Sequence, residues 1–271
     1  MGAVPVETIE VEGRRLAWRR LGAGPPLLLV NGYAATGADW DPAFLEGLAR
    51  SFRVICPDNR GTGGSELGEA ELTIEGMAAD LEALLDALEI ERVSLVGWSM
   101  GGFVAQRLAA RAPARVAALA LLSTDPGGPA SVPAEPEVWS RLTDHSGTHR
   151  EQASRLISLL FPPALAPDID RQFGDLVAAA RSELSPQTLR AQEAAMDAWH
   201  RESAPRPVAA DATPVLIAHG NLDQVIPPAN ADALATLWPG ATVETFPGCG
   251  HALMAQEPQA LADLVRDLLA S

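Results

Sequence analysis

The chain has 271 residues, of which 47% are hydrophobic and 20% are charged. A chain of this length can bury roughly three quarters of its unfolded surface, so we expect it to fold without a structural metal or a disulfide framework. The formal charge of −15 argues against nucleic acid and anionic membranes as partners, because both need Lys or Arg side chains to replace their counterions.

Every one of the 20 basic residues is an arginine. The lack of lysine excludes Schiff-base chemistry, including that of pyridoxal phosphate, and excludes a phosphate-loop lysine. The first residues lack the basic and apolar regions of a signal peptide, and no apolar run approaches the roughly 20 residues that span a bilayer. We expect a cytoplasmic protein that acts on a small-molecule substrate, as a monomer or a homodimer.

Eight short stretches have the β-branched and leucine-rich composition of strands. The first two predict a hairpin with Glu12 and Gly13 at its turn, and the inner ones are continuously apolar, as in strands buried on both faces of a parallel sheet. In chain order they cover residues 4–11, 14–20, 26–30, 52–56, 92–96, 116–122, 213–218 and 241–246.

Helical patterns separate these strands. The clearest covers residues 74–88, where apolar side chains recur at helical spacing. The alternation of strands and helices predicts an α/β fold with a doubly wound, mostly parallel, eight-stranded sheet.

The alternation breaks after Thr124. Seven prolines lie between residues 126 and 167, helical patterns follow near residues 171–183 and 186–200, and no convincing strand precedes residue 213. The aromatic and branched side chains of this stretch need burial, which favours a folded insertion over a linker. We predict a core domain of residues 1–124 and 209–271 and a helical cap of residues 125–208.

The sequence Gly97-Trp98-Ser99-Met100-Gly101 follows a predicted strand and opens a predicted helix. This is the context that the G-x-S-x-G pattern of a nucleophilic serine requires. So sharp a reversal strains the serine backbone, and a side chain at either flanking glycine would clash. It also leaves the serine hydroxyl exposed at a helix N-terminus, where the next backbone N–H is free to bind an oxyanion.

A nucleophilic serine needs a base, and the base needs an orienting acid. His251 follows the last predicted strand and Asp223 follows the strand before it, so both belong to the carboxyl edge of the sheet. The order Ser99, Asp223, His251 therefore predicts a nucleophile, an acid and a base.

With these residues in place, the chain resembles the capped serine members of the α/β-hydrolase superfamily, over about residues 4–124 and 209–271. Residues 58–65 are similar to the family's D-x-R-G-x-G-x-S turn, and residues 219–223 to its acid-bearing loop. Asn31-Gly32-Tyr33 stands where the family has His-Gly-x. The resemblance implies that the oxyanion hole is formed by the backbone N–H groups of Tyr33 and Met100.

Several alternatives stay open. His219 competes as the base, although the family uses its position structurally, and Asp211 and Asp125 compete as the acid. Tyr33, Trp40 and Trp98 are predicted to contact the substrate or, equally, to pack in the core.

Two further histidines raise the question of a metal site. His145 and His149 are four residues apart and follow Asp144, but Gly147 lies between them and no further ligand is evident. We expect them to be solvated residues of the cap, and we expect no metal.

The resemblance implies hydrolysis of a carboxylic ester or lactone of a small, largely apolar substrate through an acyl-enzyme on Ser99, without a cofactor. Relatives that open haloalkanes or epoxides use aspartate at that position, so the serine argues against both activities. Alternatives are a carbon–carbon bond hydrolase of dienoic ring-fission products, a cofactor-free haloperoxidase or perhydrolase, and a ligand sensor that keeps the triad and signals to a protein partner.

Overall fold

The computed structural model describes residues 4–11, 13–201 and 213–270. One eight-stranded sheet runs through the molecule in the order β1-β2-β4-β3-β5-β6-β7-β8. The first two strands are antiparallel to their neighbours and the others pair in parallel, which confirms the predicted fold class. The strands are β1 Glu7–Val11, β2 Arg14–Leu21, β3 Pro26–Val30, β4 Arg53–Pro57, β5 Val93–Trp98, β6 Val116–Leu122, β7 Val215–Gly220 and β8 Thr242–Phe246.

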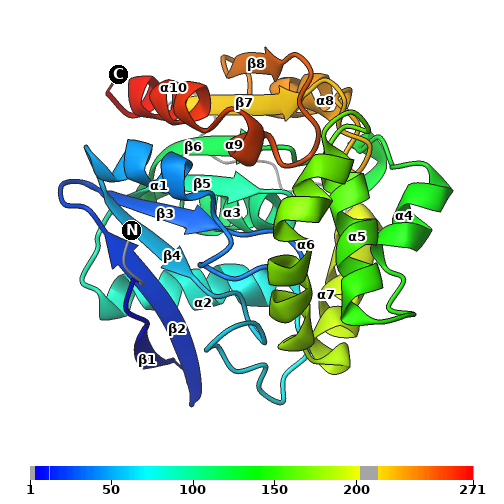
Figure 1. Cartoon of the computed structure of the whole chain (residues 1–271). Helices are drawn as coiled ribbons and strands as arrows, with labels where there is room; N and C mark the ends of the chain where they lie inside the picture. The colour runs from blue at the N-terminus through cyan, green and yellow to red at the C-terminus, as the bar shows by residue number, and fades with distance from the viewer. Residues whose placement is uncertain (1–3, 12, 202–212, 271) are drawn as a thin grey trace.

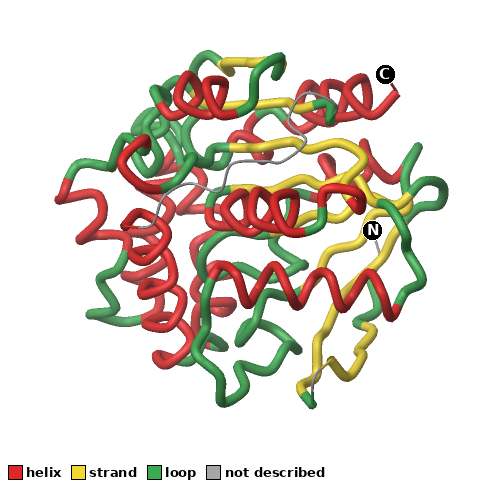
Figure 2. The backbone as a smooth tube through the Cα atoms, turned by 180° about the vertical axis from the view of Figure 1, so that it is seen from behind, coloured by secondary structure: helices red, strands yellow, loops and turns green. Residues whose placement is uncertain are grey.

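Helices cover both faces of the sheet (Figures 1 and 2). On one face lie α2 Ile74–Ala87, α3 Met100–Arg111 and α8 Asn230–Leu237. On the other lie α1 Pro42–Ala49, the short α9 Leu253–Gln256 and α10 Pro258–Ala270. Alternate side chains of β3 enter the two hydrophobic clusters, Leu28 and Val30 one and Leu27 and Leu29 the other. The continuous apolar run of this strand is thus explained by burial on both sides.

The described part of the segment between β6 and β7 contains four α-helices and no strand. They are α4 Pro136–Leu142, α5 His149–Leu160, α6 Ala166–Ser182 and α7 Pro186–Arg201. Figure 1 shows them beside the carboxyl ends of the parallel strands. The division into a core and a cap with the boundaries given above stays a prediction.

Local chemistry explains where several helices begin. Thr73 caps α2 by accepting the N–H of Gly76, and Thr148 forms a reciprocal capping box with Glu151 at the start of α5. Among the described residues, no helix is both long and apolar enough to cross a membrane. Glu12, predicted at the first hairpin turn, lies outside the described residues.

Candidate active site

Ser99 stands at the turn from β5 into α3 with a strained backbone, φ 56° and ψ −124°. A Cβ atom at Gly97 would lie only 2.6 Å from the carbonyl oxygen of Gly101, and one at Gly101 would overlap the carbonyl oxygen of Val30. The predicted strain and the predicted clashes at the flanking glycines are therefore confirmed. The hydroxyl of Thr124, just after β6, holds the turn by donating to the carbonyl of Ser99 at 2.8 Å.

His251 and Asp223 form a buried pair at the carboxyl edge of the sheet. Nδ1 of His251 lies 2.8 Å from Oδ2 of Asp223, and each side chain is at most 3% exposed. The other carboxylate oxygen accepts the backbone N–H groups of Val225 and Ile226, at 2.9 and 3.0 Å. These bonds fix the carboxylate and direct it at one ring nitrogen, so the other nitrogen is left to act on a substrate or a nucleophile.

The main chain around His251 is held by two further segments. The indole N–H of Trp98 donates to the carbonyl of His251 at 3.0 Å, and the carbonyl of Leu160, at the end of α5, accepts the N–H of Ala252 at 3.1 Å. The rings of Trp98 and His251 lie 5.4 Å apart between centroids. The histidine is therefore positioned both by the strand that carries Ser99 and by a helix of the four-helix segment.

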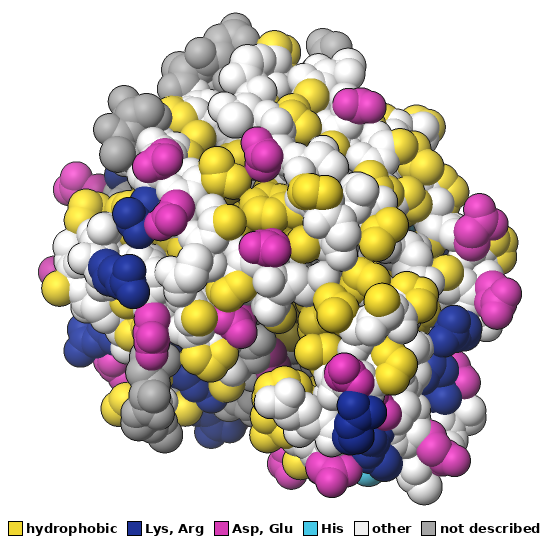
Figure 3. All heavy atoms as spheres, turned by 45° about the horizontal axis from the view of Figure 1, so that its top comes forward, with side chains coloured by type: hydrophobic (Ala, Val, Ile, Leu, Met, Phe, Trp, Pro, Cys, Tyr) yellow, Lys and Arg dark blue, Asp and Glu magenta, His cyan; other side chains and the backbone are white. Residues whose placement is uncertain are grey.

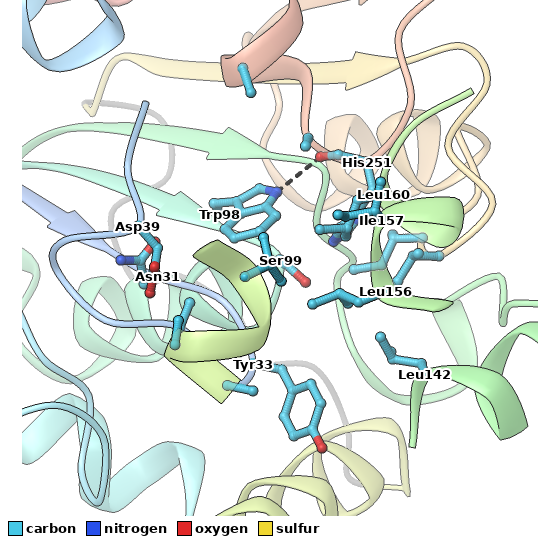
Figure 4. Close-up of a pocket in the computed structure, with 18 of the residues that line it drawn as sticks. Asn31, Tyr33, Asp39, Trp98, Ser99, Leu142, Leu156, Ile157, Leu160 and His251 are labelled. Atoms are coloured by element: carbon cyan, nitrogen blue, oxygen red, sulfur yellow. Dashed lines mark hydrogen bonds between the residues drawn. The ribbon is translucent and has the colours of Figure 1, made fainter. Parts of the chain in front are cut away.

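Ser99 and His251 line one cavity (Figure 4). No hydrogen bond joins their side chains in the described part of the chain. Bonds of this kind in empty active sites are often long and tighten only around a substrate, so the arrangement is compatible with a nucleophile and its base.

The other candidate acids and bases have different surroundings. Asp125 lies after β6 and binds His200, with Nε2 of the histidine 3.0 Å from Oδ2. His219 is fully buried at the end of β7, and its burial lowers its pKa to about 4. The third rival, Asp211, lies outside the described residues. The structure thus brings His251 to Asp223 and keeps Asp125 with another histidine.

The loop that follows β3 packs directly on the serine. A Cβ atom at Gly32 would lie 3.2 Å from Cβ of Ser99. Asn31, which replaces the family's histidine, closes the loop by donating from its side chain to the carbonyl of Thr36, and its own carbonyl accepts the side-chain N–H of Asn59 at 2.8 Å. The loop therefore has a defined place beside Ser99, and the role of the Tyr33 and Met100 N–H groups as oxyanion donors stays a prediction.

The cavity has a volume of about 1270 Å³ and a largely apolar wall. Tyr33, Trp40 and Trp98 all line it, and all three also pack in or against the hydrophobic clusters, so their contact with a substrate stays a prediction. Figure 4 shows the leucine and isoleucine side chains of the four-helix segment facing Ser99 and Trp98. They belong to residues Leu142, Leu156, Ile157 and Leu160. Leu142 and Leu160 also pack against the hydrophobic clusters of the sheet, so these side chains both line the cavity and extend the core.

His145 was expected to be solvated, and this was wrong. It is half-buried, and its Nε2 lies 2.6 Å from Oε1 of Glu193 on α7. His149 is exposed at the start of α5. Within the described residues, no group of three His, Cys, Asp or Glu side chains is placed to hold a metal ion.

Three polar residues near the cavity carry no local sequence signal. Arg181 on α6 lines the wall, and Gln192 and Glu193 on α7 reach the loop after β3. Each was part of an ordinary amphipathic helix in the sequence, and its partner lies far away along the chain. Only the packing of the four helices on the sheet reveals them.

Comparison with known proteins places the fold in one family. The family model described as alpha/beta hydrolase fold matches residues 25–258. The chain is 31% identical to the 2-hydroxymuconate semialdehyde hydrolase of Pseudomonas sp. strain CF600, over 92% of this chain and 88% of that protein.

Solved structures agree. A hydrolase from Pseudomonas aeruginosa PA01 is 30% identical with a TM-score of 0.83, and 98% of each chain is covered. The enol-lactonase of Burkholderia xenovorans LB400 is 26% identical with a TM-score of 0.79, and the match covers 98% of this chain and all of that one. These relatives are all named as enzymes that hydrolyse their substrates, but the substrates in their names differ.

Proposed function

Because the chain belongs to the α/β-hydrolase family, we propose that it is a serine hydrolase that cleaves a carboxylic ester or lactone through an acyl-enzyme on Ser99. One observation carries the proposal: the strained Ser99 and the buried His251–Asp223 pair line the same cavity. A strained nucleophile beside a carboxylate-oriented imidazole is the arrangement that acyl transfer requires.

The mechanism follows from these roles. His251 takes the proton of the Ser99 hydroxyl, and Asp223 holds the ring in the required tautomer and stabilises the imidazolium. The serine oxygen attacks the carbonyl carbon, and the N–H groups of Tyr33 and Met100 bind the resulting oxyanion, each contributing about 10²–10³ in rate. His251 then returns the proton to the leaving alcohol and later activates the water that releases the acid.

The substrate class follows from the cavity. Its volume of about 1270 Å³ exceeds that of most sites for small ligands, which range over roughly 300–1,000 Å³. Its apolar wall favours an ester or lactone with a largely hydrocarbon body. The helices α4–α7 exclude bulk water and so strengthen the electrostatic contacts around the reacting carbonyl.

The test compares two serines of one segment. We expect Ser99→Ala to abolish hydrolysis of short p-nitrophenyl esters and labelling by a fluorophosphonate, with an unchanged circular dichroism spectrum. The matched control is Ser94→Ala, which removes a hydroxyl from the other end of β5 and should keep both activities. Hydrolysis retained by the Ser99→Ala variant would refute the proposal.

A second candidate is a carbon–carbon bond hydrolase of dienoic acids. The observation in its favour is Arg181, which is only 7% exposed yet lines the cavity. Its guanidinium makes a long hydrogen bond, 3.4 Å, from Nε to the neutral side chain of Gln152, and it also interacts with the Tyr33 hydroxyl. A guanidinium so placed is suited to a substrate carboxylate, which it can bind in a bidentate manner.

The two candidates differ in a substrate screen. Faster turnover of dienoic ring-fission acids than of esters and lactones, lost selectively in Arg181→Met, would establish the second. A peroxide-dependent halogenation assay covers the haloperoxidase alternative. Turnover far below about 1 s⁻¹ on every ester, together with a ligand-dependent thermal shift, would instead favour a sensor.

A further inference from the structure

Helix α7 reaches across to the loop beside Ser99 through two adjacent side chains. Oε1 of Gln192 accepts the backbone N–H of Ala34 at 2.9 Å, and Oε1 of Glu193 accepts the hydroxyl of Tyr33. Gln192 is completely buried. The residue that is proposed to donate to the oxyanion, Tyr33, is therefore held at its own side chain and at the next peptide group.

The loop needs such support because its backbone is strained. Ala34 has a φ of 57°, in the left-handed region that a residue with a Cβ atom adopts only at a cost of about 1 kcal/mol or more. Strain of this kind persists only where the surroundings determine the conformation. The side-chain amide oxygen of Gln192 accepts the N–H of this strained residue, so the bond favours the strained conformation over a relaxed one.

Glu193 is itself fixed by a second partner. Its Oε1 lies 2.6 Å from Nε2 of His145, so one carboxylate oxygen joins α7, the loop before α5 and the Tyr33 hydroxyl. Burial and the neighbouring carboxylate raise the pKa of Tyr33 above its ordinary range. The hydroxyl consequently stays protonated and donates throughout the neutral and mildly alkaline pH range.

We propose that Gln192 and Glu193 are positioning residues for the oxyanion hole: α7 sets where the Tyr33 N–H points. The inference rests on the proposed function, and it gives the four-helix segment a part in the chemistry beyond enclosing the cavity. An oxyanion donor acts only within about 2.7–3.1 Å of the developing charge, and an error near 1 Å costs on the order of 10²-fold in rate.

Two other hydrogen bonds of α7 are made to the core away from this loop. Near the start of the helix, Thr188 donates from Oγ1 to the carbonyl of Gly61 at 3.0 Å. Near its end, the indole N–H of Trp199 donates to Asp125 at 3.1 Å. These contacts hold the helix against the core. If Gln192 had only this structural role, its substitution would have the same effect as that of Thr188, a lower Tm without a lower kcat. The comparison between the two residues is therefore the critical one.

The experiment measures kcat, KM and Tm on one ester for three variants. We expect Gln192→Leu to lower kcat about 10- to 100-fold with little change in KM, because the lost interaction acts in the transition state. Gln192→Glu keeps the acceptor oxygen, and the amide nitrogen it replaces has no hydrogen-bond partner among the described residues. Because burial favours the neutral form of the new carboxyl, this variant should recover most of kcat at and below neutral pH. Thr188→Val should lower Tm and leave kcat within about twofold.

A double-mutant cycle tests the second bond. Tyr33→Phe keeps the backbone N–H and removes the hydroxyl, and Glu193→Leu removes its acceptor. If the bond positions the loop, Tyr33→Phe lowers kcat, and the double variant loses no more than Glu193→Leu alone, which also removes the partner of His145. Fully additive losses, or an unchanged kcat in Tyr33→Phe, would overturn the role of Glu193.

The outcomes separate the inference from the proposed function. If Ser99→Ala is inactive while Gln192→Leu keeps the wild-type kcat and loses only Tm, the positioning role is wrong and the serine mechanism stands. If Ser99→Ala keeps full activity, the serine mechanism itself is wrong. Should Gln192→Leu fail to fold, the Tyr33→Phe arm still decides whether α7 positions the loop through Glu193, since it changes a single hydroxyl.

Discussion

Two buried carboxylates, Asp223 and Asp125, end up holding different histidines, and this difference assigns their roles. Asp223 binds His251, whose ring lines the cavity with Ser99. The carboxylate of Asp125 accepts four hydrogen bonds, from the main chain at residue 127 and the side chains at residues 131, 199 and 200. Asp125 therefore ties the end of α7 to the sheet, whereas Asp223 orients the proposed base.

We predict that Asp223→Asn lowers kcat by about 10⁴-fold, because the amide no longer enforces the required tautomer of His251. Asp125→Asn should change kcat little and should lower Tm, because the bond to His200 is weakened. Steady-state kinetics and thermal unfolding of both variants provide the check. A large kcat loss in Asp125→Asn alone would transfer the role of the acid to that residue.

At the scale of elements, the loop after β4 is joined to α2 by a buried ion pair. Arg60 donates to both carboxylate oxygens of Asp80, at 2.8 and 2.7 Å, and each side chain is 5% exposed. Arg14 of β2 adds a bond of 2.6 Å to the same carboxylate. The loop in turn carries Asn59, which bonds the main chain at Asn31 beside the proposed site.

We predict that Asp80→Leu lowers the free energy of unfolding by about 3–5 kcal/mol, because it leaves a buried guanidinium without its partner. A matched control lies on the same helix: Asp86 pairs with Arg115 at the surface, and Asp86→Ala should cost at most about 1 kcal/mol. Urea unfolding of both variants distinguishes the two. Equal losses would mean that the buried pair has no special contribution.

The elements differ in how far the sequence predicts them. β3 and β6 have the predicted bounds, since unbroken apolar runs between turn residues leave little freedom in where a strand begins. The G-x-S-x-G turn and the pair of His251 with Asp223 were also anticipated, because strand ends meet at one edge. By contrast, the contacts of Gln192 and Glu193 join residues 158 and 160 positions apart. They depend on how α7 docks, and a helical periodicity does not specify a docking angle.

In the whole molecule, the acidic side chains on the surface and one buried histidine in the interior affect stability in different ways. Figure 3 shows acidic side chains scattered among hydrophobic and basic ones, so the acidic residues of the viewed face form no single patch. Inside, His219 has a pKa lowered from 6.5 to about 4 because it is fully buried. The unfolded chain binds a proton at that residue more readily than the folded one does.

We predict that the free energy of unfolding falls as the pH is lowered from about 6.5 to 4, because the unfolded state takes up the proton first. The contribution of His219 is on the order of 3 kcal/mol when fully lost, from 1.36 kcal/mol per pKa unit. Urea unfolding at several pH values should show a shallower decline for His219→Gln than for the natural chain. Parallel curves would mean that the histidine is not buried in its neutral form.

The indole of Trp98 lies against the ring of His251 and donates to its main-chain carbonyl. The fluorescence of Trp98 should therefore decrease when the imidazole of His251 is protonated, because a protonated imidazole quenches indole fluorescence more strongly than a neutral one does. A fluorescence titration of the resting protein, with Trp98→Phe as the blank, would then report the protonation of the base without any turnover. Trp98 would thus serve as an intrinsic fluorescent probe for the neutral form of His251, the form that can accept the proton of Ser99.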